Sequence, residues 1–292
     1  MSPSINRYLF IFLASIAACH SRPETTTATN DEPTEYTLTG EQDTTLVLIH
    51  GWNIDQDYWS DQVAAFSDEY TVLTMNLVTE ERQQDTLREW TVDNFAQDIV
   101  RIVEQEELTN LILVGHSMGG EVALAVRERI PDRTLAIIGV DCFKDVGFIL
   151  TENVQHNIDS FMVHFAADYA GNVEQMVTTG LFEPDTQHRD AYERVLHDYQ
   201  TADPAVALSI YQQLFPAYET TKERLAQLPF PLRIIVSDLT PLNEEALREY
   251  ARNGYRIKTI QHSGHFPMIE QPEVFNQALR SFLEVIRTTP VR

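Results

Sequence analysis

The feature that most constrains this chain is a glycine-flanked serine between an apolar run and a helical pattern. Residues 111–115 (LILVG) form a continuous apolar run, which is typical of a strand buried on both faces of a sheet. The motif GHSMG follows at 115–119, and residues 119–130 have helical spacing. G-x-S-x-G in a strand–turn–helix setting predicts a nucleophile elbow, a sharp turn that lifts the serine hydroxyl above the sheet. Ser117 is therefore the predicted nucleophile.

Further apolar runs rich in β-branched residues alternate with helical patterns along the chain. Predicted strands lie at 44–49, 72–77, 135–140, 232–236 and 255–260, and predicted helices at 58–66, 90–108 and 274–286. This alternation predicts an α/β fold with a mostly parallel sheet covered by helices on both faces. Hydrophobic residues make up 43% of the chain, enough for a large core.

The alternation stops between about residues 143 and 228, where every pattern is helical. Such a long periodic stretch predicts an inserted helical cap rather than a loop. The predicted core is therefore assembled from residues 36–142 and 229–292.

The first residues are typical of an export signal rather than of the folded domain. Residues 1–18 contain one positive charge, an apolar run too short to span a bilayer, and small residues at the end. Ile16-Ala17-Ala18-Cys19 resembles the lipobox of bacterial lipoproteins, which implies lipidation of Cys19. Residues 19–35 are rich in threonine, proline and charge, and they predict a flexible tether. The expected location is the bacterial cell envelope, with a lipid anchor in the membrane.

Charge and cysteine content exclude other classes of protein. The net charge of −23 disfavours binding to nucleic acid, whose phosphate backbone is also negative. Two cysteines are too few for a disulfide framework.

Four segments together resemble the α/β-hydrolase superfamily, in particular esterase-type members with a helical cap. They are LVLIHGW at 46–52, LVGHSMGG at 113–120, IIVSD at 234–238 and HSGHFPMIEQP at 262–272. The resemblance implies that the amides of Trp52 and Met118 bind the oxyanion. The residues that match the two family motifs are His50, Gly51, Gly115, His116 and Gly119.

The resemblance also implies a histidine base in the loop after the last strand. His265 matches the family pattern better than His262, three residues earlier, although both occur in that loop. The spacing of the two histidines is compatible with a metal site. No further cysteine, histidine or carboxylate cluster in the sequence completes such a site, so no metal is predicted.

Two aspartates are candidates for the acid that orients the histidine. Asp238 follows the strand 232–236 and lies between Ser117 and His265, in the chain order of the family triad. The usual family spacing would place the acid nearer Thr240, which cannot serve. Asp141, at the end of the strand 135–140, is the alternative, and Asp238 is preferred.

The resemblance implies a serine hydrolase that needs no cofactor and acts on a small-molecule acyl substrate. A helical cap rich in aromatic residues suits an apolar acyl group. The same triad also serves C–C hydrolases, perhydrolases and acyltransferases, and the sequence does not separate these activities. A non-catalytic, lipid-anchored ligand-binding protein with the same fold is a further alternative.

Overall fold

The computed structural model describes residues 34–84, 88–184 and 186–288. The predicted signal peptide at 1–18, Cys19 and all but the end of the predicted tether at 19–35 lie outside these residues.

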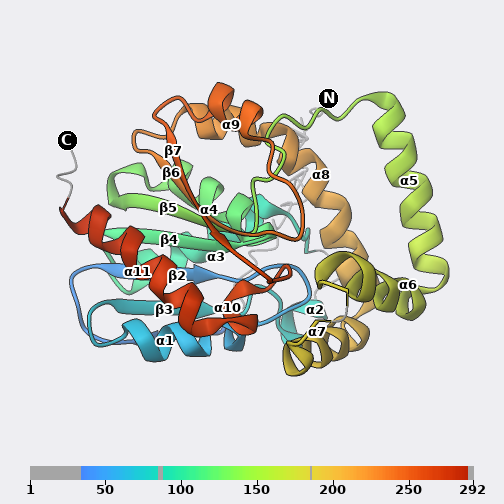
Figure 1. Cartoon of the computed structure of the whole chain (residues 1–292), viewed down its shortest axis with the longest axis horizontal. Coiled ribbons are helices and arrows are strands. Elements are labelled where there is room, and N and C mark those ends of the chain that lie inside the picture. Colours follow the sequence, from blue (N-terminus) through green and yellow to red (C-terminus); the bar gives the residue numbers. More distant parts are fainter. Residues whose placement is uncertain (1–33, 85–87, 185, 289–292) are drawn as a thin grey trace, which may run out of the picture. The chain divides into compact units, whose positions relative to one another are not determined.

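A seven-stranded sheet forms the centre of the fold (Figure 1). Its spatial order is β1-β3-β2-β4-β5-β6-β7, and every pair is parallel except β1 with β3. The strands are β1 (Tyr36–Thr39), β2 (Thr45–Ile49), β3 (Thr71–Met75), β4 (Leu111–His116), β5 (Thr134–Val140), β6 (Leu232–Ser237) and β7 (Tyr255–Ile260). Strands β2, β3, β4 and β6 are buried along their whole length, as their apolar runs predict.

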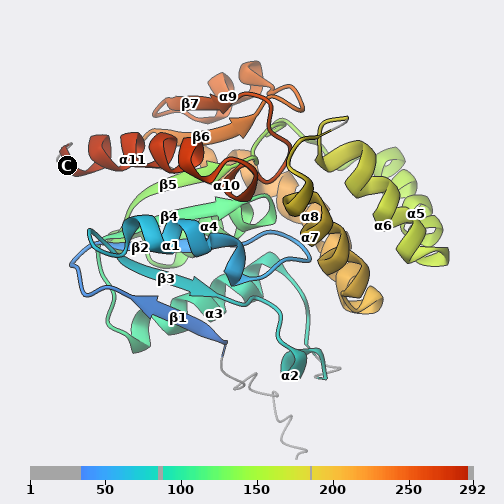
Figure 2. The same cartoon turned by 60° about the horizontal axis from the view of Figure 1, so that its bottom comes forward.

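Helices cover both faces of the sheet, which confirms the predicted α/β fold with a mostly parallel sheet. Helix α1 packs against α11 on one face, and α3 packs against α4 on the other (Figure 2). The helices outside the β5–β6 connection are α1 (Ser60–Phe66), α2 (Glu80–Gln83), α3 (Val92–Gln105), α4 (Met118–Arg129), α9 (Glu244–Tyr250), α10 (Pro267–Glu270) and α11 (Pro272–Thr288), with two 3-10 turns, η1 (Gln56–Trp59) and η2 (Pro131–Arg133).

The connection between β5 and β6 is almost entirely helical. It contains α5 (Glu152–Ala167), α6 (Tyr169–Met176), the π-helical turn η3 (Val177–Leu181), α7 (Arg189–Thr201) and α8 (Pro204–Ala226), which we call the helical segment. It lies beside the carboxyl ends of the parallel strands (Figure 2). Helix α8 packs on α4, and the Trp52 Nε1 donates a hydrogen bond to the Ala207 carbonyl at 2.8 Å. The helical segment is therefore tied to the loop that follows β2.

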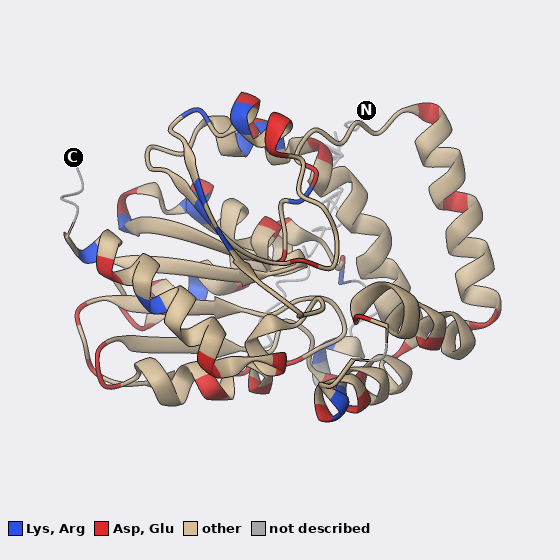
Figure 3. Ribbon diagram, in the orientation of Figure 1, with Lys and Arg blue, Asp and Glu red and all other residues tan. Residues whose placement is uncertain are grey.

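Basic side chains are interspersed with acidic ones on α7, α9 and α11 (Figure 3). Within the described residues, no helix is both long enough and apolar enough to cross a bilayer.

Candidate active site

Ser117 lies in a strained turn between β4 and α4. Its backbone has φ 52° and ψ −119°, a left-handed conformation that costs a non-glycine residue energy and marks functional turns. The flanking glycines allow this geometry. A Cβ at Gly115 would lie 2.2 Å from the Gly119 carbonyl oxygen, and one at Gly119 would lie 2.4 Å from the oxygen of Ile49. The turn therefore requires both glycines and presents Ser117 at the amino end of α4.

His265 lies in the loop between β7 and α10 and faces the same cavity as Ser117. Its Nδ1 lies 2.6 Å from Oδ2 of Asp141. Because a carboxylate only accepts, Nδ1 carries the proton and Nε2 keeps its lone pair for use as a base. No hydrogen bond joins Ser117 to His265 in the described part of the chain, and such bonds often tighten only when substrate is bound.

The carboxylate that meets His265 belongs to Asp141, not to Asp238, so the preferred pairing from the sequence is corrected. Successive side chains of an extended strand point to opposite sides. Ser237, the last residue of β6, points to Asp141, and both its amide and its hydroxyl donate to Asp141 Oδ1, at 2.7 and 2.8 Å. Asp238 then faces away, toward Ser263, whose amide lies 3.4 Å from Asp238 Oδ1.

Asp141 remains charged although its side chain is buried. Burial alone would raise its pKa, but the hydrogen bond and charge of His265 and the nearby ammonium of Lys144 outweigh it and hold the pKa well below its usual range. The Lys144 Nζ lies 2.9 Å from Asp141 Oδ1 and also donates to Thr240 at 2.6 Å. A fixed anion therefore faces the Nδ1 edge of the His265 ring.

Two buried side chains hold the backbone of the histidine loop. Glu270 accepts hydrogen bonds from the amides on either side of His265, from Gly264 at 2.7 Å and from Phe266 at 2.9 Å. His116 lies with Nε2 2.8 Å from the His265 carbonyl oxygen. Burial, together with the charge of His265, lowers the pKa of His116 to about 3, so this ring is neutral and donates the bond.

The loop after β2, with the sequence HGW, lies directly against the elbow. A Cβ at Gly51 would lie 3.2 Å from the Cβ of Ser117. His50 fixes the loop, because its Nδ1 donates to the Gly51 carbonyl at 2.7 Å and its Nε2 accepts from the Leu77 amide at 3.0 Å. Burial lowers the pKa of His50 to about 4, in keeping with this neutral form. The loop that carries Trp52 is thereby held against the elbow.

The cavity above Ser117 has a volume of about 470 Å³. Its apolar wall combines residues after β5 with residues of the helical segment, namely Phe143, Val146, Phe148, Leu181, Phe215 and Tyr218. Such a chamber has the size and lining of a site for a small apolar group.

Glu121 adds a buried carboxyl group to this cavity, one helical turn after Ser117. It accepts a hydrogen bond from the Thr221 hydroxyl at 2.8 Å. Burial raises the pKa of Glu121 to about 7, although Thr221 and the charge of Arg224 oppose the rise. A charge here would offset the dipole of α4, but the protein environment favours the neutral acid.

This raised pKa predicts a dependence of stability on pH. The folded chain holds the Glu121 proton to about pH 7, whereas the ordinary pKa of a glutamate side chain is 4.5. The stability that the neutral carboxyl contributes is therefore complete below pH 4.5 and is lost as pH rises through 7. We expect Glu121→Gln to match the wild type at pH 4 and to be about 1–3 kcal/mol more stable at pH 8. Denaturant unfolding at both pH values measures the difference. The exposed Glu104→Gln is the control, and equal stability of wild type and Glu121→Gln at pH 8 would refute the assignment.

Two further carboxylates, those of Glu183 and Asp238, lie close to His262. Ligand atoms of Glu183, Asp238 and His262 all lie within 4.8 Å of one another. The sequence did not indicate that these two carboxylates lie beside His262.

The geometry is accompanied by a clear family match. Residues 46–278 match the model of the "Alpha/beta hydrolase family". The chain belongs to this family. Membership of this family supports a hydrolase enzyme.

Three proteins illustrate the likeness of this alpha/beta hydrolase to its relatives. It is 24% identical to a pimeloyl-[acyl-carrier protein] methyl ester esterase of Yersinia enterocolitica, over 87% of this chain and 98% of the other. It is 23% identical to Karrikin insensitive 2 receptor CA of Petunia hybrida, over 81% and 90%. The solved structure of a thermophilic esterase from Thermogutta terrifontis superposes with a TM-score of 0.72 at 23% identity, over 90% and 98%.

Several site residues escaped the sequence analysis. Ser237, Lys144 and Glu270 contact Asp141 or the histidine loop. Ser237 and Glu270 lie in two of the segments that carry the family resemblance, but the sequence analysis assigned neither a role, and Lys144 lies outside those segments. The one available signal was an acidic residue, Glu270, in the otherwise apolar stretch FPMIE. Its burial could not be inferred without the fold.

Proposed function

We propose that this alpha/beta hydrolase is a serine hydrolase that cleaves an ester or related acyl bond through an acyl-enzyme. The observation that carries the proposal is the hydrogen bond between His265 and Asp141 in the loop that faces Ser117 across one cavity. A serine hydroxyl is a weak nucleophile without a base, and this pairing supplies one with the required tautomer.

In the proposed reaction, the Oγ of Ser117 attacks the substrate carbonyl carbon while His265 Nε2 takes the hydroxyl proton. The amides of Met118 and Trp52 donate to the oxyanion of the tetrahedral intermediate. The protonated His265 then gives its proton to the departing alkoxide, which leaves as an alcohol. Water, deprotonated by the same nitrogen, then attacks the acyl carbon. The bond to Ser117 Oγ breaks, His265 returns the proton to Oγ, and the carboxylic acid leaves. Asp141 acts through His265 as a positioning residue, since it holds the ring and stabilises its charged form.

The cavity lining favours a small apolar acyl group with one polar feature. Phe143, Phe148 and Phe215 supply apolar surface, while Glu121 places a carboxyl group within it. A substrate with a hydrogen-bonding group at the far end of its acyl chain would satisfy Glu121, which otherwise relies on Thr221.

A panel of p-nitrophenyl esters with acyl chains of increasing length tests this proposal. We expect turnover to be highest for short chains, because a cavity of about 470 Å³ holds only a small acyl group. Product analysis separates the alternatives: transfer to an added alcohol indicates an acyltransferase, peracid formation with hydrogen peroxide a perhydrolase, and cleavage of β-diketones a C–C hydrolase. Saturable ligand binding without turnover would replace the proposal with a ligand-binding role, which the similarity to a receptor makes the second candidate.

We further propose that Cys19 carries a lipid that anchors the chain in the bacterial cell envelope. The support is the sequence of residues 1–19, with its short apolar run and the Ile-Ala-Ala-Cys ending. In a bacterial host, the wild type is expected in the membrane fraction and Cys19→Ala in the soluble fraction, because acyl chains supply the membrane affinity. Fractionation with immunodetection measures this, and equal membrane retention of both chains would contradict the anchor.

A further inference from the structure

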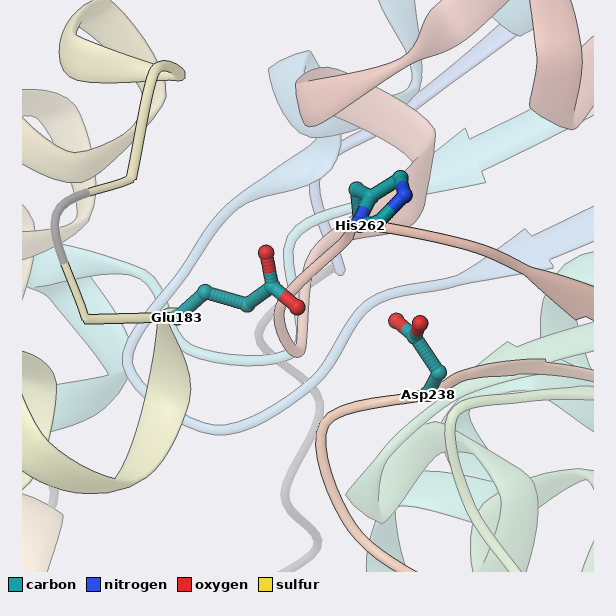
Figure 4. Close-up of side chains that lie close together, drawn as sticks. All are labelled: Glu183, Asp238 and His262. Carbon is teal, nitrogen blue, oxygen red and sulfur yellow. The ribbon is translucent and has the colours of Figure 1, made fainter.

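Three segments that are far apart in the sequence bring their polar side chains together beside the histidine loop. Glu183 comes from the helical segment just after η3, Asp238 from the loop after β6, and His262 from the loop after β7 (Figure 4). One carboxylate oxygen from each acid and one ring nitrogen lie within 4.8 Å of one another. These residues take no part in the contacts that hold His265 against Asp141.

The backbone around this cluster is held in place. His262 has a positive φ of 57° in the turn that follows β7. Its carbonyl oxygen accepts a hydrogen bond from the Gln271 side chain at 2.9 Å and lies 3.3 Å from Nε2 of His188. Asp238 accepts the 3.4 Å bond from the amide of Ser263. The loop positions are therefore fixed, while the exposed side chains of Asp238 and His262 can still rotate.

The three side chains are better placed to bind a cation than to pair with one another. Within the described residues, no ion pair of 4.0 Å or less joins His262 to either acid, and two carboxylates this close repel. Bonds of about 2.0–2.2 Å to a tetrahedral zinc ion place donor atoms about 3.3–3.6 Å apart. Small rotations of the exposed side chains would bring all three donors within bonding distance of one ion.

We propose that Glu183, Asp238 and His262 form a binding site for a divalent transition-metal ion, of which Zn²⁺ and Mn²⁺ are the fitting examples. One imidazole nitrogen and two carboxylate oxygens are ligands for such ions, whereas Ca²⁺ and Mg²⁺ prefer oxygen alone. Three protein ligands leave positions for water. Two of these ligands had other roles in the sequence analysis. Asp238 was the preferred acid of the triad, and His262 was the alternative to His265 as the base.

A metal ion here would clamp the helical segment to the core next to His265. The His265 amide donates to the Leu181 carbonyl at 2.7 Å, and Leu181 is two residues before Glu183. Metal binding would hold this backbone contact closed. The ion acts on the position of the loop and takes no part in the chemistry at Ser117.

Calorimetric titration of the untagged, EDTA-treated chain with ZnCl₂ and MnCl₂ tests the site. We expect one saturable site per chain and slower amide hydrogen exchange at His265 in the presence of metal. Removing a ligand should weaken binding by at least about tenfold, in Glu183→Gln and in Asp238→Asn, and the double variant Asp238→Asn/His262→Gln should show no saturable binding. Glu174→Gln and His197→Gln, exposed on α6 and α7, are matched controls that should bind as the wild type does.

Circular dichroism without metal verifies that each variant is folded. Absence of saturable binding to the wild type would overturn the proposal, as would binding of unchanged affinity in the double variant. Because this readout does not involve ester turnover, its failure is distinguishable from failure of the proposed hydrolase function.

Discussion

Replacing Ser117 by alanine is expected to reduce turnover of a short p-nitrophenyl ester by about 10⁴-fold or more. The reason is that no other hydroxyl occupies the turn between β4 and α4, where His265 can remove the proton. The residual rate would come from the oxyanion donors, which still polarise the carbonyl when the nucleophile is absent. Initial rates at saturating ester measure the loss.

The matched control for this variant is Ser263→Ala. Ser263 is a buried serine in the neighbouring loop, and its hydroxyl donates to the Gly264 carbonyl at 3.4 Å. Its loss should affect turnover far less than that of Ser117. Thermal unfolding of both variants establishes that they fold. Turnover in Ser117→Ala within tenfold of the wild type would show that the elbow is not the source of the nucleophile.

Exchanging Asp141 for asparagine is expected to lower kcat by about 10⁴-fold, because an amide that donates to His265 Nδ1 selects the wrong tautomer. With its proton on Nε2, the ring can no longer accept the Ser117 proton. The contacts of Asp141 with Ser237 and Lys144 stabilise a negative charge, so the variant also loses that part of the electrostatic arrangement.

The comparison variant is Asp238→Asn, which carries the same chemical change one residue beyond β6. Its carboxylate faces Ser263 and His262, so we expect a loss of kcat below tenfold when the assay contains EDTA. The pH–rate profile gives a second readout, since loss of Asp141 should remove the limb that reports the histidine base. A large loss in Asp238→Asn together with a small one in Asp141→Asn would reverse the assignment.

Local patterns were sufficient to predict most of the sheet and the elbow. Strands β2 and β4 are buried on both faces, so each appears in the sequence as a continuous apolar run. The turn at Ser117 is predicted by one contiguous motif. Strand β1 was not predicted, because Tyr36–Thr39 is a short edge strand with partly exposed residues and no apolar run.

The partner of His265 depended on information that a single strand does not contain. Asp141 and Asp238 both follow buried strands, and both lie between Ser117 and His265 in the sequence, so chain order does not separate them. The choice is decided across β5 and β6, where the amide and hydroxyl of Ser237 both bind Asp141. Likewise, Glu183 is separated from His262 by most of the helical segment and two strands, so only the fold brings them together.

The most direct test of the central claim is covalent labelling of the folded chain with a fluorophosphonate, followed by mass spectrometry of its peptides. The serine oxygen displaces fluoride from phosphorus only when a base has activated it. We predict a single phosphonylated residue, Ser117, at a rate that falls by orders of magnitude in Asp141→Asn. Failure of the folded wild type to react, or reaction at a residue other than Ser117, would contradict the account.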